Sequence, residues 1–144
     1  MFMAVFTATM AAATGYKLVS PNGRLMSEIN VGDSVTFTLS DDRQSILSPS
    51  TIAIEWTDGT VWGAGMKVRK AQRLSVDEVI PSPMYKKSQV RDKYNRLVLN
   101  ATAGFSIEFR MYDDGMAYRF ISSLSGEEHT IKNEKAVYRL SQNF

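Results

Sequence analysis

Adjacent acidic residues are side chains well suited to acid–base chemistry, and three such pairs are Asp41-Asp42, Asp113-Asp114 and Glu127-Glu128. Two carboxyl groups act together as acid and base when they face each other across the bond to be broken. Neighbours on a tight turn point apart and stay solvated, and consecutive residues of a strand point to opposite faces. These pairs therefore predict turns, and we assign no catalytic residue to them.

His129 is the single histidine of the sequence, and it follows directly on the Glu127-Glu128 pair. The alternation of side chains along a strand favours a solvated turn here over a metal cluster. A Ser-His-Asp triad needs a nucleophile within hydrogen-bond reach of the histidine, and no nucleophile elbow lies near His129 in the sequence. Calcium takes roughly six to eight oxygen ligands, and no EF-hand spacing occurs. We expect no metal site on this chain alone, and a site completed by another domain is the alternative.

Aromatic residues are the second set with binding potential. Trp56 and Trp62 flank an Asp58-Gly59 turn, and Tyr85 follows the Pro81-Ser82-Pro83 segment. Exposed aromatic rings stack on the apolar faces of sugars, so these three residues form a candidate substrate-binding platform. The alternative is core or interface packing, because tryptophan is highly buried on average.

The charge balance argues against a nucleic-acid partner. The 17 Lys and Arg residues against 15 Asp and Glu give a net charge of +2, without a basic block, so nucleic-acid binding lacks its usual footprint. The run Lys86, Lys87, Arg91 and Lys93 is typical of a solvated strand edge, with a docking surface as the functional alternative. The absence of cysteine fits a cytoplasmic and a periplasmic protein equally well.

The first 14 residues, MFMAVFTATMAAAT, are uncharged and end in alanines. They resemble the apolar core and cleavage region of a secretory signal, although the positive n-region is missing. We interpret residues 1–14 as a signal-peptide remnant, which predicts a periplasmic or secreted bacterial protein; an edge strand is the alternative. The run is too short to span a bilayer.

Residues 15–144 predict a single all-β domain. Short stretches with period-2 alternation, such as Val35-Phe37-Leu39, are separated by turn signals at intervals of about 10 residues, a pattern typical of an antiparallel β-sandwich. Ser48-Pro49-Ser50 predicts a break between strands. The segment 66–79 is the least clear, and we expect a strand, a loop and a second strand there.

The segment 105–120, FSIEFRMYDDGMAYRF, predicts a hairpin. We place its two-residue turn at Asp114-Gly115, because such turns favour Gly at positive φ. That register sets Phe109 opposite Phe120 and places Arg110 opposite Arg119. Opposed like charges are unfavourable, so we expect Glu108, on the same outer face, to pair with the arginines.

Four segments in the same order resemble the N-terminal domain of glycoside hydrolase family 97. They are YKLVSPNGRLMSEINV, SILSPSTIAIEW, PSPMYKKSQVRDKYNRLVL and FRMYDDGMAYRF. The resemblance runs from about Tyr16 to the end of the chain. It implies a β-super-sandwich related to sugar mutarotases, of which this chain is the first part.

The family resemblance also implies a function. Family members are bacterial enzymes acting on α-glucosides or α-galactosides, with catalytic carboxylates on a (β/α)8 barrel and a calcium ion at the active site. We therefore expect this chain to be a non-catalytic domain that supports the barrel, inactive alone and without a cofactor of its own. Oligosaccharide is the expected ligand of the whole enzyme, and a homodimer through an exposed apolar face is expected of the isolated domain.

Two other classes of function remain open at this point. One is a free-standing carbohydrate-binding module that holds polysaccharide through Trp56 and Trp62. The other is a periplasmic structural or assembly protein that uses the sandwich as an interaction surface. A binding module requires aromatic rings at the surface, whereas an accessory domain requires an apolar patch larger than a monomer normally exposes.

Overall fold

The computed structural model describes residues 13–42, 44–83, 86, 88–126 and 128–141. All regular secondary structure within these residues is β-strand. One sheet contains β1 (Thr14–Val19), β2 (Leu25–Val31), β3 (Val35–Asp41), β4 (Gln44–Trp56), β5 (Val61–Trp62) and β10 (Ile131–Leu140). The other contains β6 (Val68–Pro81), β7 (Gln89–Ala101), β8 (Phe105–Met111) and β9 (Met116–Ser122). The predicted all-β architecture is confirmed.

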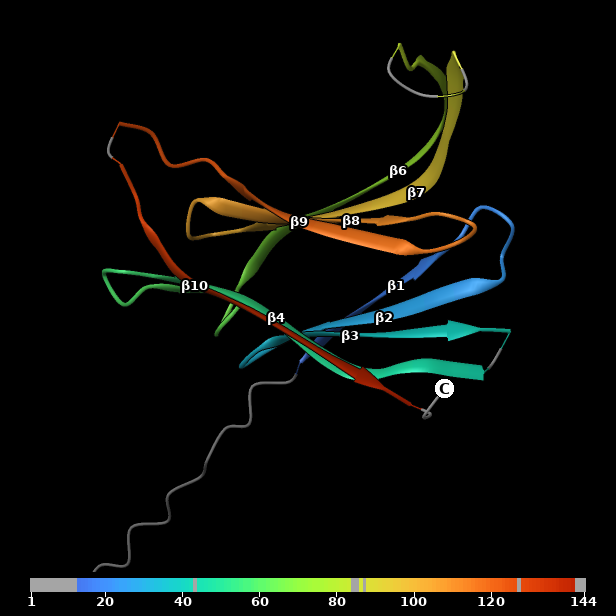
Figure 1. Ribbon diagram of the computed structural model, residues 1–144. Coiled ribbons are helices and arrows are strands. Elements are labelled where there is room, and N and C mark those ends of the chain that lie inside the picture. The colour runs from blue at the N-terminus through green and yellow to red at the C-terminus, as the bar shows by residue number, and fades with distance from the viewer. Residues whose placement is uncertain (1–12, 43, 84–85, 87, 127, 142–144) are drawn as a thin grey trace, which may run out of the picture.

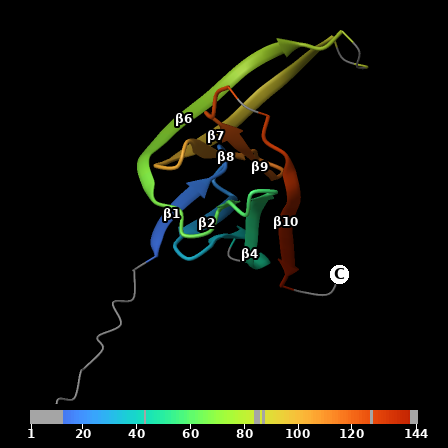
Figure 2. The same cartoon turned by 90° about the vertical axis from the view of Figure 1, so that its left-hand side faces the viewer.

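The two sheets form the layers of a sandwich, and all strand pairs are antiparallel (Figure 1). The first sheet has the order β1-β2-β3-β4-β10, with β5 paired to β4, and the second has the order β6-β7-β8-β9. Neighbours are joined by hairpins, except that the chain leaves the second sheet after β9 and returns to pair β10 with β4. Figure 2 shows β10 at the same side of the sandwich as β9.

The core lies between the two layers and follows the alternation of the strands. From the first sheet it receives Leu18, Leu25, Ile29, Val31, Val35, Phe37 and Ile52, and from the second Leu97, Leu99, Ala101, Phe105, Ile107, Phe109 and Met111. Side chains at alternate positions of one strand point to the same face. Residues such as Glu108 and Arg110 therefore lie on the outer face of the second sheet, the face turned away from the first sheet.

Two predicted interruptions are wrong. We expected a strand, a loop and a second strand in the segment 66–79. Its residues from Val68 onward instead belong to one continuous strand, β6. Ser48-Pro49-Ser50 does not end a strand, because β4 runs through it. The registers with β3 and β10 both shift around Pro49. Proline has no N–H to donate to a neighbouring strand, and an irregularity in both ladders accommodates it without ending β4.

The predicted β8–β9 hairpin is present, but its register differs by two residues. Met111 lies opposite Met116 and Phe109 opposite Tyr118, so the turn is centred on Asp113-Asp114. The backbone N–H of Tyr112 donates to the carbonyl of Gly115 (2.8 Å). A shift by an even number keeps every side chain on its predicted face. It removes the expected opposition of arginines, because Arg119 lies opposite Glu108.

The distal parts of β6 and β7 extend beyond the sandwich (Figures 1 and 2). Pairing between β7 and β8 ends at Asn95, whereas pairing between β6 and β7 continues outward to Pro81 and Gln89. Residues 76–81 and 89–94 therefore form a two-stranded ribbon, which we call the arm. The rest of the described strands form the body.

Candidate functional site

A buried carboxylate marks the outer face of the second sheet. Glu108 is 2% exposed, although its neighbours Ile107 and Phe109 are the ones that point into the core. Arg110 donates from Nε to Oε1 of Glu108, and Arg119 donates from Nη2 to Oε2 (2.8 Å). The first arginine lies on β8 and the second on β9, directly opposite Glu108. Both carboxylate oxygens are thus engaged by guanidinium groups, as the sequence predicted for this glutamate.

The ion cluster favours the charged forms of Glu108 and Arg110. Burial raises the pKa of Glu108, but the hydrogen bonds from Arg110 and Arg119 outweigh burial, so the pKa lies below its ordinary value. The hydrogen bond with Glu108 raises the pKa of Arg110. Glu108 therefore carries a negative charge near neutral pH and has no proton to donate. Its oxygens are occupied, so it suits positioning of the arginines better than acid–base chemistry.

Aromatic rings cover the same cluster from the side of the arm. The guanidinium carbon of Arg110 lies 4.7 Å from the centre of the Tyr94 ring, a cation–π contact. The Tyr94 and Tyr112 rings lie 5.1 Å apart at an angle of 45°. Tyr94 is buried although it faces outward on β7. This contact has no local sequence signal, since it depends on which residues the β7–β8 register brings together.

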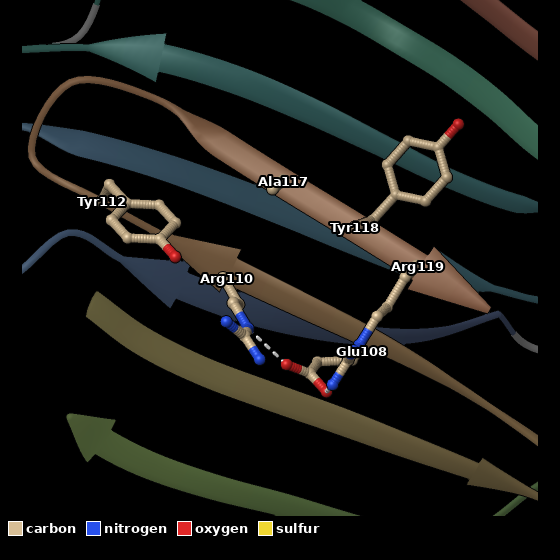
Figure 3. A pocket seen from close by; sticks show the side chains of 6 residues that line it. All are labelled: Glu108, Arg110, Tyr112, Ala117, Tyr118 and Arg119. Atoms are coloured by element: carbon tan, nitrogen blue, oxygen red, sulfur yellow. Dashed lines mark hydrogen bonds and ion pairs between the residues drawn. The ribbon is translucent and has the colours of Figure 1, made fainter. Parts of the chain in front are cut away.

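A shallow pocket of about 200 Å³ opens over the cluster (Figure 3). It is lined by Glu108, Arg110, Tyr112, Ala117, Tyr118 and Arg119. Small-molecule sites are usually larger, roughly 300–1,000 Å³. Among these lining residues Glu108 is the one carboxylate, whereas hydrolysis of a glycosidic bond uses two across the scissile bond. The pocket is therefore better suited to a side chain of a packing partner than to a sugar undergoing hydrolysis.

The predicted sugar platform is not assembled at the surface. Trp56 and Trp62 are 9% and 4% exposed, and their rings lie 4.7 Å apart edge to face. Trp62 also stacks on Phe105 at 4.7 Å. Both indoles pack in the core. The sugar platform stays a hypothesis, and neither tryptophan presents an exposed face on which a sugar could stack. Tyr85 lies outside the described residues.

Of the acidic pairs, Asp41-Asp42 and Asp113-Asp114 have the turn roles that the sequence indicated. Asp113 accepts a hydrogen bond from the backbone N–H of Asn22 (2.8 Å), which joins the β8–β9 turn to the β1–β2 turn. Asp41 and Asp42 both form ion pairs with Arg24, at 2.8 and 3.6 Å. These contacts hold turns together, and Asp113 does so between two segments that are 91 positions apart.

The remaining candidates bring no ligand set together. Glu127 lies outside the described residues, and the His129 ring meets Trp56 edge to face at 5.7 Å. No group of three or more His, Cys, Asp or Glu suited to a metal ion occurs within the described part of the chain. Across the same residues, no helix has the length and apolarity needed to cross a membrane.

Arg91 and Lys93 of the basic run lie on the arm, in β7. Arg91 donates from Nε and Nη2 to the two carboxylate oxygens of Asp77, each at 2.7 Å, and Lys93 lies 4.0 Å from the same carboxylate. Lys86 is exposed, and Lys87 lies outside the described residues. Arg91 agrees with the solvated strand edge predicted for this run, because its side chain is 65% exposed.

Sequence reasoning missed a contact between the two edge strands. The hydroxyl groups of Tyr118 on β9 and Tyr138 on β10 lie 3.3 Å apart, and both rings pack against Phe37. Burial raises the pKa of Tyr118, and the hydrogen bond with Tyr138 adds to this effect. The contact bridges the two sheets at one side of the sandwich, where no local pattern in the sequence announces it.

The fold places the chain in the class of antiparallel β-sandwich domains. Its charged residues stabilise turns and the outer face of the second sheet. Residues 18–144 match the family described as Glycosyl-hydrolase 97 N-terminal. The chain belongs to this family, as the four ordered segments predicted.

A curated relative gives the same assignment. The retaining alpha-galactosidase of Bacteroides thetaiotaomicron is 41% identical over 116 residues, which are 81% of this chain and 18% of that protein. The chain thus spans less than one fifth of the length of this relative, and its matched segment is one domain's worth of sequence.

Solved structures share the fold at low sequence identity. A glycoside hydrolase family 97 enzyme from Pseudoalteromonas sp. strain K8, in complex with panose, superposes with a TM-score of 0.73 at 17% identity, over 88% of this chain and 20% of that one. A beta-arabinopyranosidase superposes with a TM-score of 0.76 at 19% identity, over 87% and 21% of the two chains. Both likenesses concern the β-sandwich.

Proposed function

We propose that this chain is the non-catalytic N-terminal domain of a glycoside hydrolase acting on α-galactosides or α-glucosides, and that it supports the catalytic (β/α)8 barrel of that enzyme. The relative named a retaining alpha-galactosidase favours α-galactosides as the substrate class. In this proposal the catalytic carboxylates belong to polypeptide outside residues 1–144. The domain contributes a rigid sheet surface against which the catalytic part of the enzyme is positioned.

The edge strand β10 carries this proposal. In the described sheet its neighbour is β4, and its exposed apolar side chains are Ile131 (53%), Val137 (38%), Tyr138 (55%) and Leu140 (63%). Ile131 lies opposite Trp56 and Val137 opposite Thr51, and these two β4 residues point to opposite faces of the sheet. Both faces of the strand therefore expose apolar groups. Natural edge strands are usually protected by charge, twist or a covering segment. Such a strand is suited to being covered by further polypeptide.

We also propose that calcium binds to the remainder of the enzyme. The described residues offer no group of three or more His, Cys, Asp or Glu suited to a metal ion, so they do not fit the ion by themselves. Calcium would supply Lewis-acid or orienting chemistry where the sugar is bound, and this chain has no step to perform through it. A periplasmic or secreted location accords with the uncharged N-terminal 14 residues.

The decisive experiment compares the chain alone with the full-length enzyme on aryl α-galactosides and aryl α-glucosides. We expect no turnover from residues 1–144 and hydrolysis by the full-length enzyme. A matched enzyme lacking residues 15–144 should lose activity together with thermal stability, because its barrel has lost a supporting face. Hydrolysis by residues 1–144 alone would contradict the non-catalytic assignment.

Self-association provides a second measurement on the isolated chain. We expect sedimentation velocity to show concentration-dependent dimers through the apolar face of β10, and Leu140→Lys to shift the population to monomers. Glu55→Lys on the neighbouring strand is the control, since Glu55 is a solvated residue paired with Lys132. A strictly monomeric wild-type chain would indicate that β10 is adequately protected by itself and would remove the main support for this proposal.

A further inference from the structure

The outer side of the arm carries apolar side chains that the described residues leave uncovered. Leu74, at the foot of the arm, is 50% exposed, and Ile80 is 41% exposed. Ile80 pairs with Val90, and Val76 pairs with Tyr94. Partners directly opposite each other in a ladder share a face, so all five side chains lie on the side of Tyr94, the outer side. They form an apolar stripe that runs from exposed Ile80 to the buried ring of Tyr94 and is interrupted by the opposed pair Glu78 and Asp92.

The foot of the arm is held from both sides. On the outer side the Tyr94 ring contacts Tyr112 and the guanidinium of Arg110. On the inner side Asn95 donates from Nδ2 to the carbonyl of Val19 (2.8 Å), and Arg73 donates from Nη1 to the carbonyl of Lys17 (2.6 Å). The direction of the arm is therefore fixed where it leaves the body. A surface fixed in advance loses less conformational entropy on binding than a mobile one.

Beyond its foot the arm has little to stabilise it. Residues 76–81 and 89–94 pair only with each other in the described sheet. A two-stranded ribbon is marginally stable in water, and a third strand or a packing layer is usually required. The arm is nevertheless six residue pairs long, which gives a packing layer from outside these residues a substantial surface to cover.

Charge on the outer face is arranged in two zones. Arg96 lies directly opposite Arg110, and with Arg119 these arginines outnumber the one carboxylate of the cluster, Glu108. Along the arm, Glu78 lies directly opposite Asp92, which places two acidic groups together. Like charges opposed in a ladder are unfavourable unless a partner compensates them. A complementary surface would present an acidic group over the sheet and a basic group over the arm.

We propose that the apolar stripe of the arm and the adjoining arginine cluster form the docking surface for the catalytic portion of the same enzyme. This inference rests on the proposed function, because the occupant is the polypeptide that makes up the other four fifths of the relatives. The occupant lays an apolar surface along Leu74, Val76 and Ile80. It places a carboxylate in the pocket beside Arg119, and a basic side chain between Glu78 and Asp92.

Amide hydrogen exchange tests the docking surface in the full-length enzyme. We expect arm amides to exchange at least about tenfold slower in the full-length enzyme than in residues 1–144 alone, because docking suppresses local opening of the ribbon. Ile80→Asp should abolish that difference by placing a charge in the apolar stripe. Equal exchange of the arm in both proteins would overturn the proposal.

Val79→Asp is the matched control, because Val79 is adjacent and more exposed (60%) but lies on the inner side of the arm with Arg91. Protection should persist in this variant, and equal loss in both variants would overturn the assignment of the outer side. Sedimentation of residues 1–144 tests whether a second copy of the chain is the occupant instead. Dimers that dissociate with Ile80→Asp but not with Val79→Asp would overturn the proposal that the catalytic portion is the occupant. None of these readouts uses activity, so an inactive enzyme with a protected arm would refute the proposed substrate class alone.

Discussion

Strand β7 passes through two regions of different character, the arm and the body. In the body its side chains Leu97 and Leu99 are fully buried between the sheets, and it has both β6 and β8 as neighbours. In the arm it keeps β6 but loses β8, and the arm exposes apolar residues such as Val79 and Ile80. A strand is usually both hydrogen-bonded to its neighbours and buried, and β7 separates these two properties. Pairing with β6 is sufficient to form the strand, whereas burial of its side chains requires packing of the other sheet against it.

The two regions also use the same ion-pair chemistry at different depths. In the body Glu108 is held by two arginines with 3% of its side chain exposed, and in the arm Asp77 is held by Arg91 with 47% exposed. A buried carboxylate that loses its partners leaves charges unsatisfied, whereas an exposed one returns to water. We therefore expect similar contacts to have unequal effects on stability.

Removing a core ring should produce the largest effect. Phe109 is fully buried and packs beneath Tyr118 at 6.3 Å. Phe109→Ala should lower the free energy of unfolding of the chain by about 3–5 kcal/mol, through lost burial and the cavity left behind. Urea denaturation followed by tryptophan fluorescence measures this, since Trp62 lies in the same core. Leu74→Ala on the outer face is the control, and a loss as large as that of Phe109→Ala would show that burial does not decide how much each side chain stabilises the fold.

The strands of the body could be predicted from sequence because alternation and turn residues are local signals. The turn at Asp113-Asp114 shows where that information stops. Asp114-Gly115 has the composition of a hairpin turn, but Asp113 accepts the backbone N–H of Asn22 from the other sheet. A contact between segments so distant in sequence is invisible to a local pattern. The apolar faces were still predicted correctly, because the error was an even number of residues.

The arm could not be predicted in the same way. Its β6 portion mixes Asp77, Glu78 and Val79 without a buried face, so the alternation that indicates a half-buried strand is weak there. Likewise, the arginine cluster was foreseen from Glu108, whereas Tyr94 joined it through a register that only the fold reveals. A strand buried in the core can be predicted from its hydrophobic pattern, whereas a strand whose residues are mostly exposed, as in β6, carries only a weak pattern.

Neutralising Glu108 should give the second-largest effect. Glu108→Gln keeps the shape of the side chain but leaves Arg110 and Arg119 without a negative partner. Hydrogen bonds to charged groups contribute roughly 1.5–3 kcal/mol. Because the Arg119 side chain is 60% exposed, solvent screening reduces the expected loss to about 1–2 kcal/mol of unfolding free energy at neutral pH. Chemical denaturation at pH 7 measures it.

The pH dependence of the same variant checks the cause. The pKa of Glu108 is lower in the folded state than in the unfolded one, so ionised Glu108 stabilises the fold above its unfolded pKa. That contribution is lost as pH falls through the folded pKa. Wild type and Glu108→Gln should therefore differ most near neutrality and converge under acid conditions. A difference that stays constant from neutral to acid pH would show that the loss comes from packing.

The smallest effect is expected in the arm, from Asp77→Asn. Arg91 donates to both carboxylate oxygens of Asp77 at 2.7 Å, and this hydrogen bonding lowers the pKa of Asp77. Both side chains are nevertheless largely solvated, and water replaces the lost contact at little cost. We expect no shift in the unfolding midpoint of residues 1–144 beyond the error of the measurement.

The change should appear instead as faster amide exchange confined to the arm, since the ribbon opens locally without unfolding the body. A midpoint shift equal to that of Glu108→Gln would mean that arm and body unfold as one unit, and burial would then no longer account for the difference between them.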